Sequence, residues 1–209
     1  TLVVLDADGR TVSRPGAIGP QVDPSLTTRA VPFNDLTAMD AALASGDVAI
    51  VLIEPALTNI GIVLPDPGYL DGVRELTRRH GTLLAIDETH TICAGPGGCT
   101  ARWGLEPDFL VIGKTIGGGV PVAAYGMSDE VAARLEARMG TDDVDVSGVG
   151  GTLAGSALAM SAMRATLSSS LTAGQFAVAE PLAAEWARGV ESEVSARGLD
   201  WHVQRLGCR

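Results

Sequence analysis

Short apolar runs alternate along this chain with stretches of helical periodicity. The runs that we expect to form strands are 48–53, 82–86, 109–112 and 121–126. Those at 48–53 and 82–86 are continuously apolar, as is typical of parallel strands buried on both faces. Between them, residues 36–44 and 69–80 carry apolar side chains at helical spacing, and a glycine follows each stretch. This order of strand, helix and strand predicts an α/β fold with a mostly parallel sheet flanked by helices.

The two ends of the chain are less regular. Residues 1–5 are expected to form a strand, and the Pro- and Gly-rich stretch 13–24 a surface loop. Residues 141–151 are predicted to form an acidic, Gly-rich loop, and a last strand is expected to begin at Trp201. The remaining helices are predicted at 129–139, 153–167 and 177–196.

Composition excludes some classes of protein. A hydrophobic content of 46% and a mean hydropathy of +0.24 indicate a globular chain with a good core. The net charge of −10 disfavours binding to nucleic acid or to an anionic membrane. No apolar run approaches the roughly twenty residues of a spanning helix, and no leader is visible. Three cysteines fit free thiols in the cytoplasm. Cys93 and Cys99 lack enough further ligands nearby for a metal site, so no metal is expected.

Lys114 is the only lysine of the chain, which carries fourteen arginines. A lysine amine can condense with a carbonyl to form a Schiff base, whereas arginine stays protonated. The residue follows the strand predicted at 109–112 and precedes several glycines, which places it at the carboxyl end of that strand. Gly113-Lys114-Thr115 also looks like the end of a phosphate-binding loop. That pattern requires glycine where Asp108 stands, so we reject this alternative.

Asp87 ends the preceding predicted strand, 27 residues before Lys114. In a parallel sheet with short connections these two strand ends lie side by side. By itself, Asp87 would be interpreted as a turn or capping residue. Beside a lysine that forms an imine, its carboxylate fits pyridoxal phosphate, because it would keep the pyridine nitrogen protonated. The lysine would then also move a proton as a general acid and base.

Several motifs taken together resemble the class III pyridoxal-phosphate-dependent aminotransferases. They are Glu54-Pro55 with Asn59 and Gly61, then Asp87-Glu88, the run 113–126 and the run 151–160. The last two runs are most similar to the glutamate-1-semialdehyde aminomutase branch. The resemblance covers roughly residues 30–170. It implies the fold type I of pyridoxal-phosphate enzymes and a homodimer with shared active sites.

The resemblance also implies the residues that bind the cofactor. Lys114 is the expected Schiff-base lysine and Asp87 the expected partner of the pyridine nitrogen. Glu88 is expected beside Asp87 in the wall of the site. Thr89 replaces the apolar residue that packs on the ring in the family. Thr152 is expected to bind the cofactor phosphate of the neighbouring subunit, with a plain helix cap as the alternative.

The expected reaction is transfer of an amino group, by a transaminase or an aminomutase, on an amino-acid or amino-ketone substrate. Glu54 and Asn59 are the expected substrate-binding residues. Residues 92–94 replace the family's Gly-Phe-Arg, so an arginine expected near the substrate is absent. His90 is not a catalytic residue of the family and is expected to have a structural role in its loop.

Members of the family are longer than this chain at both ends. We therefore expect residues 1–170 to form a large cofactor-binding domain that is incomplete at its amino terminus. Residues 171–209 would be the beginning of a small carboxyl-terminal domain. Residues 14–19 do not resemble the family's phosphate-binding loop. The alternative to an enzyme is a truncated or non-catalytic fragment that needs a companion polypeptide.

Overall fold

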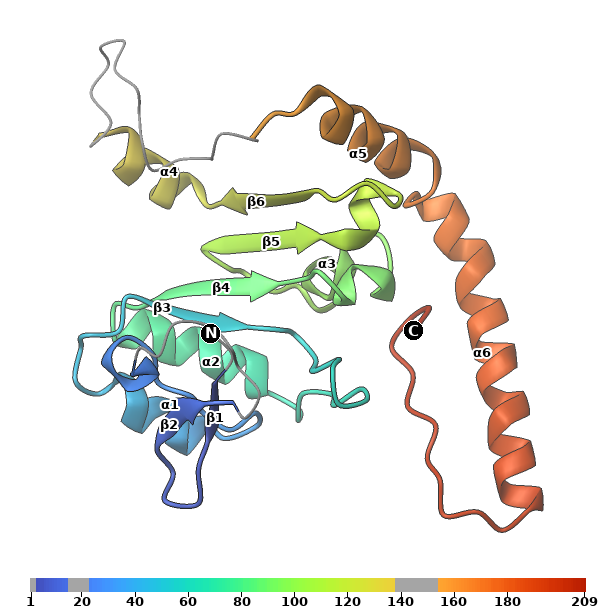
Figure 1. The fold of residues 1–209 in the computed structure, drawn as a ribbon, viewed down its shortest axis with the longest axis horizontal. Coiled ribbons are helices and arrows are strands. Elements are labelled where there is room, and N and C mark those ends of the chain that lie inside the picture. The colour runs from blue at the N-terminus through green and yellow to red at the C-terminus, as the bar shows by residue number, and fades with distance from the viewer. Residues whose placement is uncertain (1–2, 15–22, 138–153) are drawn as a thin grey trace.

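A four-stranded sheet forms the centre of the chain in the computed structural model, which describes residues 3–14, 23–137 and 154–209 (Figure 1). Its strands, in spatial order, are β3 (Ile50–Ile53), β4 (Leu83–Asp87), β5 (Phe109–Gly113) and β6 (Ala123–Met127). The first three are parallel, and β6 is antiparallel to β5. The structure thus confirms the predicted α/β class with a mostly parallel sheet.

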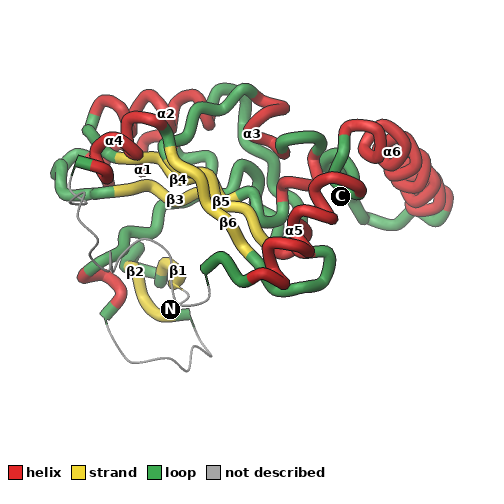
Figure 2. Tube along the Cα trace, turned by 90° about the horizontal axis from the view of Figure 1, so that it is seen from above, coloured by secondary structure: helices red, strands yellow, loops and turns green. Residues whose placement is uncertain are grey.

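Two helices cover one face of β3 and β4 (Figure 2). Helix α1 (Leu36–Leu43) begins where the Asp35 carboxylate accepts a hydrogen bond of 2.8 Å from the Ala38 N–H. Helix α2 (Tyr69–Arg79) connects β3 to β4, as parallel strands require. The core between helices and sheet consists of Met39, Leu43, Val51, Ile53, Tyr69, Val73, Leu76, Leu84 and Ile86.

The prediction that the run 48–53 is buried on both faces is wrong. Along β3, exposed and buried residues alternate, and the side chains of Ile50 and Leu52 are 41% and 69% exposed. The α1 and α2 core takes only Val51 and Ile53. Burial on both faces needs a second covering layer. No such layer lies over Leu52 among the described residues.

The Gly-rich segment after β4 is more ordered than its composition indicates. It contains a 3₁₀ helix, Thr91–Ala94, and a short helix α3 (Gly98–Trp103), and residues 95–97 between them lie outside any helix. Gly97 and Gly104 flank α3 in the left-handed conformation, with φ of 77° and 64°. Gly97 therefore stands just before the first turn of α3, and Gly104 ends its last turn.

The amino-terminal part forms a hairpin of β1 (Val3–Leu5) and β2 (Thr11–Ser13), followed by a 3₁₀ helix, Pro24–Leu26. Beyond the sheet, α4 (Asp129–Glu136), α5 (Ala157–Ser169) and α6 (Ala173–Ala196) follow in order. Helix α6 begins earlier than expected because the Thr172 hydroxyl accepts a hydrogen bond from the Gln175 N–H. No helix in these described ranges is long and apolar enough to cross a membrane.

The strand expected from Trp201 is also wrong. Residues 199–205 are irregular, and Trp201 is 68% exposed. Instead of joining a sheet, the chain turns back from α6 toward the loop after β4 (Figure 1). Leu206 is buried there against Ala94 and Cys99. A strand needs a partner for its backbone groups, and none of the described strands lies beside this segment.

Candidate functional site

The carboxyl ends of β4 and β5 bring the two main candidate residues to one edge of the sheet. Asp87 is the last residue of β4 and pairs in register with Val111 of β5. Lys114 follows the last residue of β5. Because the strands are parallel, both side chains start from the edge where open α/β sheets place their sites. The order of elements predicted from the sequence therefore leads to the expected juxtaposition.

Lys114 has an unusual backbone conformation. Its φ of 46° lies in the left-handed region, which costs a non-glycine residue roughly 1–3 kcal/mol. The residue opens a 3₁₀ helix, Lys114–Gly117, and its side chain is exposed in this chain. Nζ lies 3.1 Å from Nε2 of His90. The strained turn thus holds the amine above the strand ends, accessible to a ligand.

Asp87 uses only part of its carboxylate within the protein. Oδ1 accepts a hydrogen bond of 2.8 Å from the Thr89 N–H. Oδ2 has no hydrogen-bond partner among the described residues. The Thr89 side chain lies next to Gly113, where a Cβ would be 3.5 Å from its hydroxyl oxygen. Asp87 is half-buried and can therefore accept a hydrogen bond from a ligand.

Glu88 points into the protein and is fully buried. Its carboxylate accepts hydrogen bonds from the Thr91 hydroxyl at 2.5 Å, from the Cys99 N–H at 3.2 Å, and from both the N–H and the hydroxyl of Thr100. A Cβ on Gly98 would collide with this carboxylate. These contacts tie the 3₁₀ helix to α3. They favour a structural role, and cofactor binding by Glu88 stays a prediction.

The predicted substrate residues lie in the loop after β3. The Glu54 carboxylate accepts a hydrogen bond of 2.6 Å from the Thr58 hydroxyl, and Asn59 is exposed. The Thr58 carbonyl in turn accepts a hydrogen bond of 3.1 Å from Arg209. Thr152 lies outside the described residues. The structure therefore joins the β3 loop to the strand ends, while substrate contacts remain predictions.

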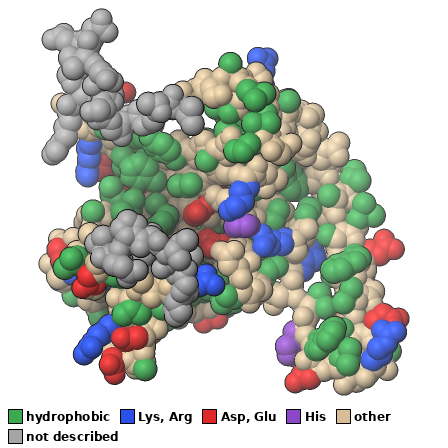
Figure 3. All heavy atoms as spheres, in the orientation of Figure 1, with side chains coloured by type: hydrophobic (Ala, Val, Ile, Leu, Met, Phe, Trp, Pro, Cys, Tyr) green, Lys and Arg blue, Asp and Glu red, His purple; other side chains and the backbone are tan. Residues whose placement is uncertain are grey.

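His90 and Arg209 join the site although sequence reasoning did not place them there. Nη1 of Arg209 lies 2.9 Å from Nδ1 of His90, whose other nitrogen contacts Lys114. Charged and histidine side chains accordingly gather at the centre of the face shown in Figure 3. His90 had a signal, since it follows Asp87 by three residues. Arg209 had none, because 119 residues separate it from His90.

The cysteines behave as protected thiols. Burial, followed by the nearby Glu88 carboxylate, raises the pKa of Cys99 to about 12. Burial also raises the pKa of Cys93 and of Cys208. In the ranges that the structure describes, no three potential ligands are grouped to hold a metal ion. These thiols are therefore poor nucleophiles at neutral pH.

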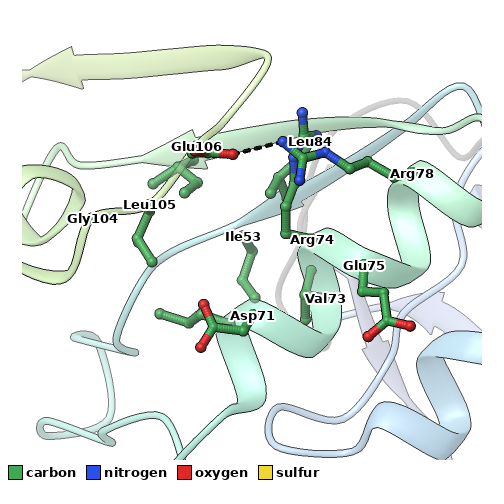
Figure 4. A pocket seen from close by; sticks show the side chains of 12 residues that line it. Ile53, Asp71, Val73, Arg74, Glu75, Arg78, Leu84, Gly104, Leu105 and Glu106 are labelled. Carbon is green, nitrogen blue, oxygen red and sulfur yellow. Dashed lines mark hydrogen bonds and ion pairs between the residues drawn. The ribbon is translucent and has the colours of Figure 1, made fainter.

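A pocket of about 370 Å³ lies elsewhere, between α2 and residues 104–106 (Figure 4). Arg78 donates a hydrogen bond of 2.6 Å to Glu106 at this pocket. Arg74, which also lines it, is bound to Asp108. Neither Lys114 nor Asp87 contributes to its wall. Since its main cations are already paired, the strand ends are the better candidate for chemistry.

Comparisons with known proteins show which family the chain resembles. Residues 21–186 match the family described as aminotransferase class-III. A glutamate-1-semialdehyde 2,1-aminomutase of Thermomicrobium roseum is 38% identical over 209 residues, which are 99% of this chain and 47% of that protein. The chain thus spans about half the length of the curated relatives it matches.

Solved structures show the same fold. A variant of a glutamate-1-semialdehyde aminomutase from Pseudomonas aeruginosa PAO1, in complex with PMP, matches 99% of this chain and 46% of its own. Its TM-score is 0.91 and its identity 46%. An omega-transaminase from Sphaerobacter thermophilus matches with a TM-score of 0.76 and 30% identity, over 96% of this chain and 45% of its own.

Proposed function

The chain belongs to the class III aminotransferase family, and from this membership we propose that it carries the catalytic lysine of an enzyme that transfers amino groups with pyridoxal 5'-phosphate. The observation that carries the proposal is the pair of groups at the ends of β4 and β5. An exposed lysine amine and a carboxylate with one uncommitted oxygen start from the same edge of a parallel sheet. These groups fit the aldehyde and the ring nitrogen of that cofactor.

Each residue has a defined task in this proposal. Bound cofactor supplies a sink for the electrons left on a substrate carbon when its proton is removed. Lys114 would hold the cofactor through Nζ and later move the proton with the same atom. Asp87 would accept a hydrogen bond at Oδ2 and keep the ring nitrogen protonated. Thr89 would line the cofactor ring. Thr152 would bind the phosphate of the cofactor held by the neighbouring subunit.

Within the family we propose an aminomutase of the glutamate-1-semialdehyde type. The relatives with 38% and 46% identity carry that name. Glu54 and Asn59 would then contact an amino-acid or amino-ketone substrate from the loop after β3. We further propose a homodimer with shared sites, and a domain boundary near residue 170. A screen of amino donors and acceptors would separate an aminomutase from a transaminase.

A non-catalytic subunit that works with a companion polypeptide is the second candidate. The observation in its favour is the open apolar face at Ile50 and Leu52, together with the chain's share of its relatives' length. Covalent capture of the cofactor by the chain, alone or mixed with a polypeptide that supplies the rest of the relatives' length, supports the enzyme. Failure to capture cofactor in both cases supports the second candidate.

The test uses the fact that the chain contains a single lysine. Protein incubated with pyridoxal phosphate is reduced with borohydride, digested and analysed by mass spectrometry. We expect the added mass on Lys114, and its loss in Lys114→Ala and Lys114→Arg, because a guanidinium does not condense with the aldehyde. A double variant, Lys114→Arg with Arg197→Lys, moves the only lysine to the far end of α6. Equal labelling of that variant would refute a specific site.

A further inference from the structure

Three side chains form a continuous chain of contacts that the proposed reaction does not yet use. Nη1 of Arg209 lies 2.9 Å from Nδ1 of His90, and Nε2 of His90 lies 3.1 Å from Nζ of Lys114. We propose that Arg209 and His90 are positioning residues that hydrogen-bond the Lys114 amine through its lone pair and so favour its uncharged form. This inference rests on the proposed function of Lys114 as the amine that captures the cofactor.

The polarity of the two hydrogen bonds carries the argument. Arginine has five N–H donors, no acceptor, and does not lose its proton in proteins. Nδ1 of His90 must therefore accept the bond from Arg209. A neutral imidazole with an acceptor at one nitrogen carries its hydrogen on the other, so we assign the hydrogen to Nε2. Nε2 then donates to Nζ of Lys114.

The consequence falls on the lysine. An ammonium group has three donors and no acceptor, so a protonated Lys114 would point a hydrogen at the Nε2–H. An unprotonated amine has a lone pair that accepts this bond. That lone pair is also what a nucleophilic amine needs. The contacts with Arg209 and His90 therefore favour the reactive form of the amine over the charged form.

Packing holds Arg209 where this arrangement needs it. Leu206, three residues earlier, is 5% exposed and packs with Ala94 and Cys99. The Cys208 N–H donates a hydrogen bond of 3.2 Å to the Cys93 carbonyl. A Cβ on Gly207 would lie 2.5 Å from the Ala94 backbone, so only glycine permits this approach.

Further hydrogen bonds hold Arg209 and the backbone of His90 in place. Nη2 of Arg209 donates to the Thr58 carbonyl at 3.1 Å. The Cys93 thiol donates to the carbonyl of His90 at 2.9 Å. His90 thus has a fixed backbone on one side and, on the other, one contact from a guanidinium that the Thr58 carbonyl also holds. A purely structural loop histidine would not need to face a cation at one nitrogen and an amine at the other.

Charged groups of both signs lie around the amine and act in opposite directions, because a nearby carboxylate favours the ammonium. The guanidinium of Arg209 approaches from the carboxyl-terminal segment, and a nearby cation disfavours an ammonium. Asp87 ends β4, and Glu54 lies in the loop after β3 with its carboxylate bonded to Thr58. The Glu88 carboxylate is buried and bonded to residues 91–100.

The experiment measures the reactivity of the single lysine without any cofactor. An acetylating reagent is added to the 209-residue chain, with N-acetyl-lysine in the same tube as reference amine, and acetylation of Lys114 is followed by mass spectrometry between neutral and strongly alkaline pH. We expect His90→Phe and Arg209→Met to lower the relative rate roughly tenfold near neutral pH, a change of about 1.4 kcal/mol. In strongly alkaline buffer, where lysine amines carry no proton, the rates should converge.

Two further variants sharpen the test. Glutamine at position 90 has an oxygen that accepts from Arg209 and an amide that donates to Nζ, so His90→Gln should retain most of the reactivity. Arg197→Gln removes a positive charge from the exposed end of α6 and should react like the unaltered chain. Circular dichroism checks the fold of each variant. If His90→Phe does not fold, Arg209→Met gives the same comparison without a change at the loop.

Two results would overturn the proposal. Equal rates at neutral pH in all variants would show that the pair does not affect the amine. An equal loss at every pH would show altered access rather than altered protonation. Because no cofactor is present, the outcome is separate from the borohydride test of Lys114. A chain that passes the acetylation test but captures no cofactor would retain the positioning pair and lose the proposed function.

Discussion

Replacing Glu88 with glutamine tests whether this residue organises the loop after β4 or lines the site. The change keeps the size and shape of the side chain but removes the charge and converts one oxygen to an NH₂ group. In the structure, Oε2 accepts from the Thr91 hydroxyl and the Cys99 N–H, and Oε1 accepts from both donors of Thr100. An amide can satisfy only part of this set.

The size of the effect follows from these partners. The remaining oxygen of Glu88→Gln can still accept from Thr100, and the Thr91 hydroxyl can rotate to accept from the new amide. The Cys99 N–H then faces another donor, and a buried donor without a partner costs about 1–3 kcal/mol. Loss of charge assistance weakens the other bonds by roughly 1 kcal/mol. Removing a buried charge recovers part of this cost. We expect a net loss of about 2 kcal/mol.

The assay is urea unfolding followed by circular dichroism, which gives the midpoint and the slope. The slope should stay unchanged and the midpoint should fall. Glu106→Gln is the matched control, because Glu106 is 69% exposed and pairs with Arg78 on the surface. Its loss should be below about 1 kcal/mol. Borohydride reduction of Glu88→Gln should still show cofactor on Lys114.

The opposite pair of results would refute this reasoning. If Glu88→Gln unfolds within about 0.5 kcal/mol of the unaltered chain and also captures less cofactor, its hydrogen bonds do not stabilise the fold. Glu88 would then belong to the wall of the site, as the family resemblance implies. A large loss of stability with normal capture would place it in the support of the loop.

Three further results are expected. Asp87→Asn should retain covalent cofactor on Lys114 but lower the rate of turnover by ~10²–10⁴-fold, because the ring nitrogen loses its carboxylate; near-normal turnover would exclude this role. Burial raises the pKa of Asp108, but hydrogen bonds from Arg74 and the Leu84 N–H outweigh it and leave that pKa below its ordinary value. The stabilisation of the fold by Asp108 is therefore present above the ordinary carboxyl range and is lost as pH falls through the lowered pKa. Asp108→Asn should accordingly flatten the acid side of a plot of unfolding free energy against pH. An unchanged acid side would contradict this. Iodoacetamide should modify Cys99 only after unfolding, because burial raises its pKa to about 12, and rapid modification of the native chain would show an open thiol.

Local pattern in the sequence predicted the elements that carry the main site. The apolar runs became β4 and β5, and the periodic stretch before β4 became α2 with nearly the expected ends. Since parallel strands share one edge for their carboxyl ends, strand order placed Asp87 and Lys114 at the same edge of the sheet. The single lysine then indicated which residue to propose for the chemistry. The prediction of the elements succeeded because each element depends on neighbours in the sequence or on one rule of topology.

Tertiary structure decided what neighbouring residues do not encode. A run of apolar residues predicts a strand but not how many layers cover it, so the exposed face of β3 at Leu52 was missed. Two adjacent acids look alike in sequence, yet Asp87 faces the strand ends while Glu88 turns inward to α3. Arg209 reaches His90 only because the last residues pack on the loop after β4. Contacts across 119 residues depend on that packing, and no local pattern records it.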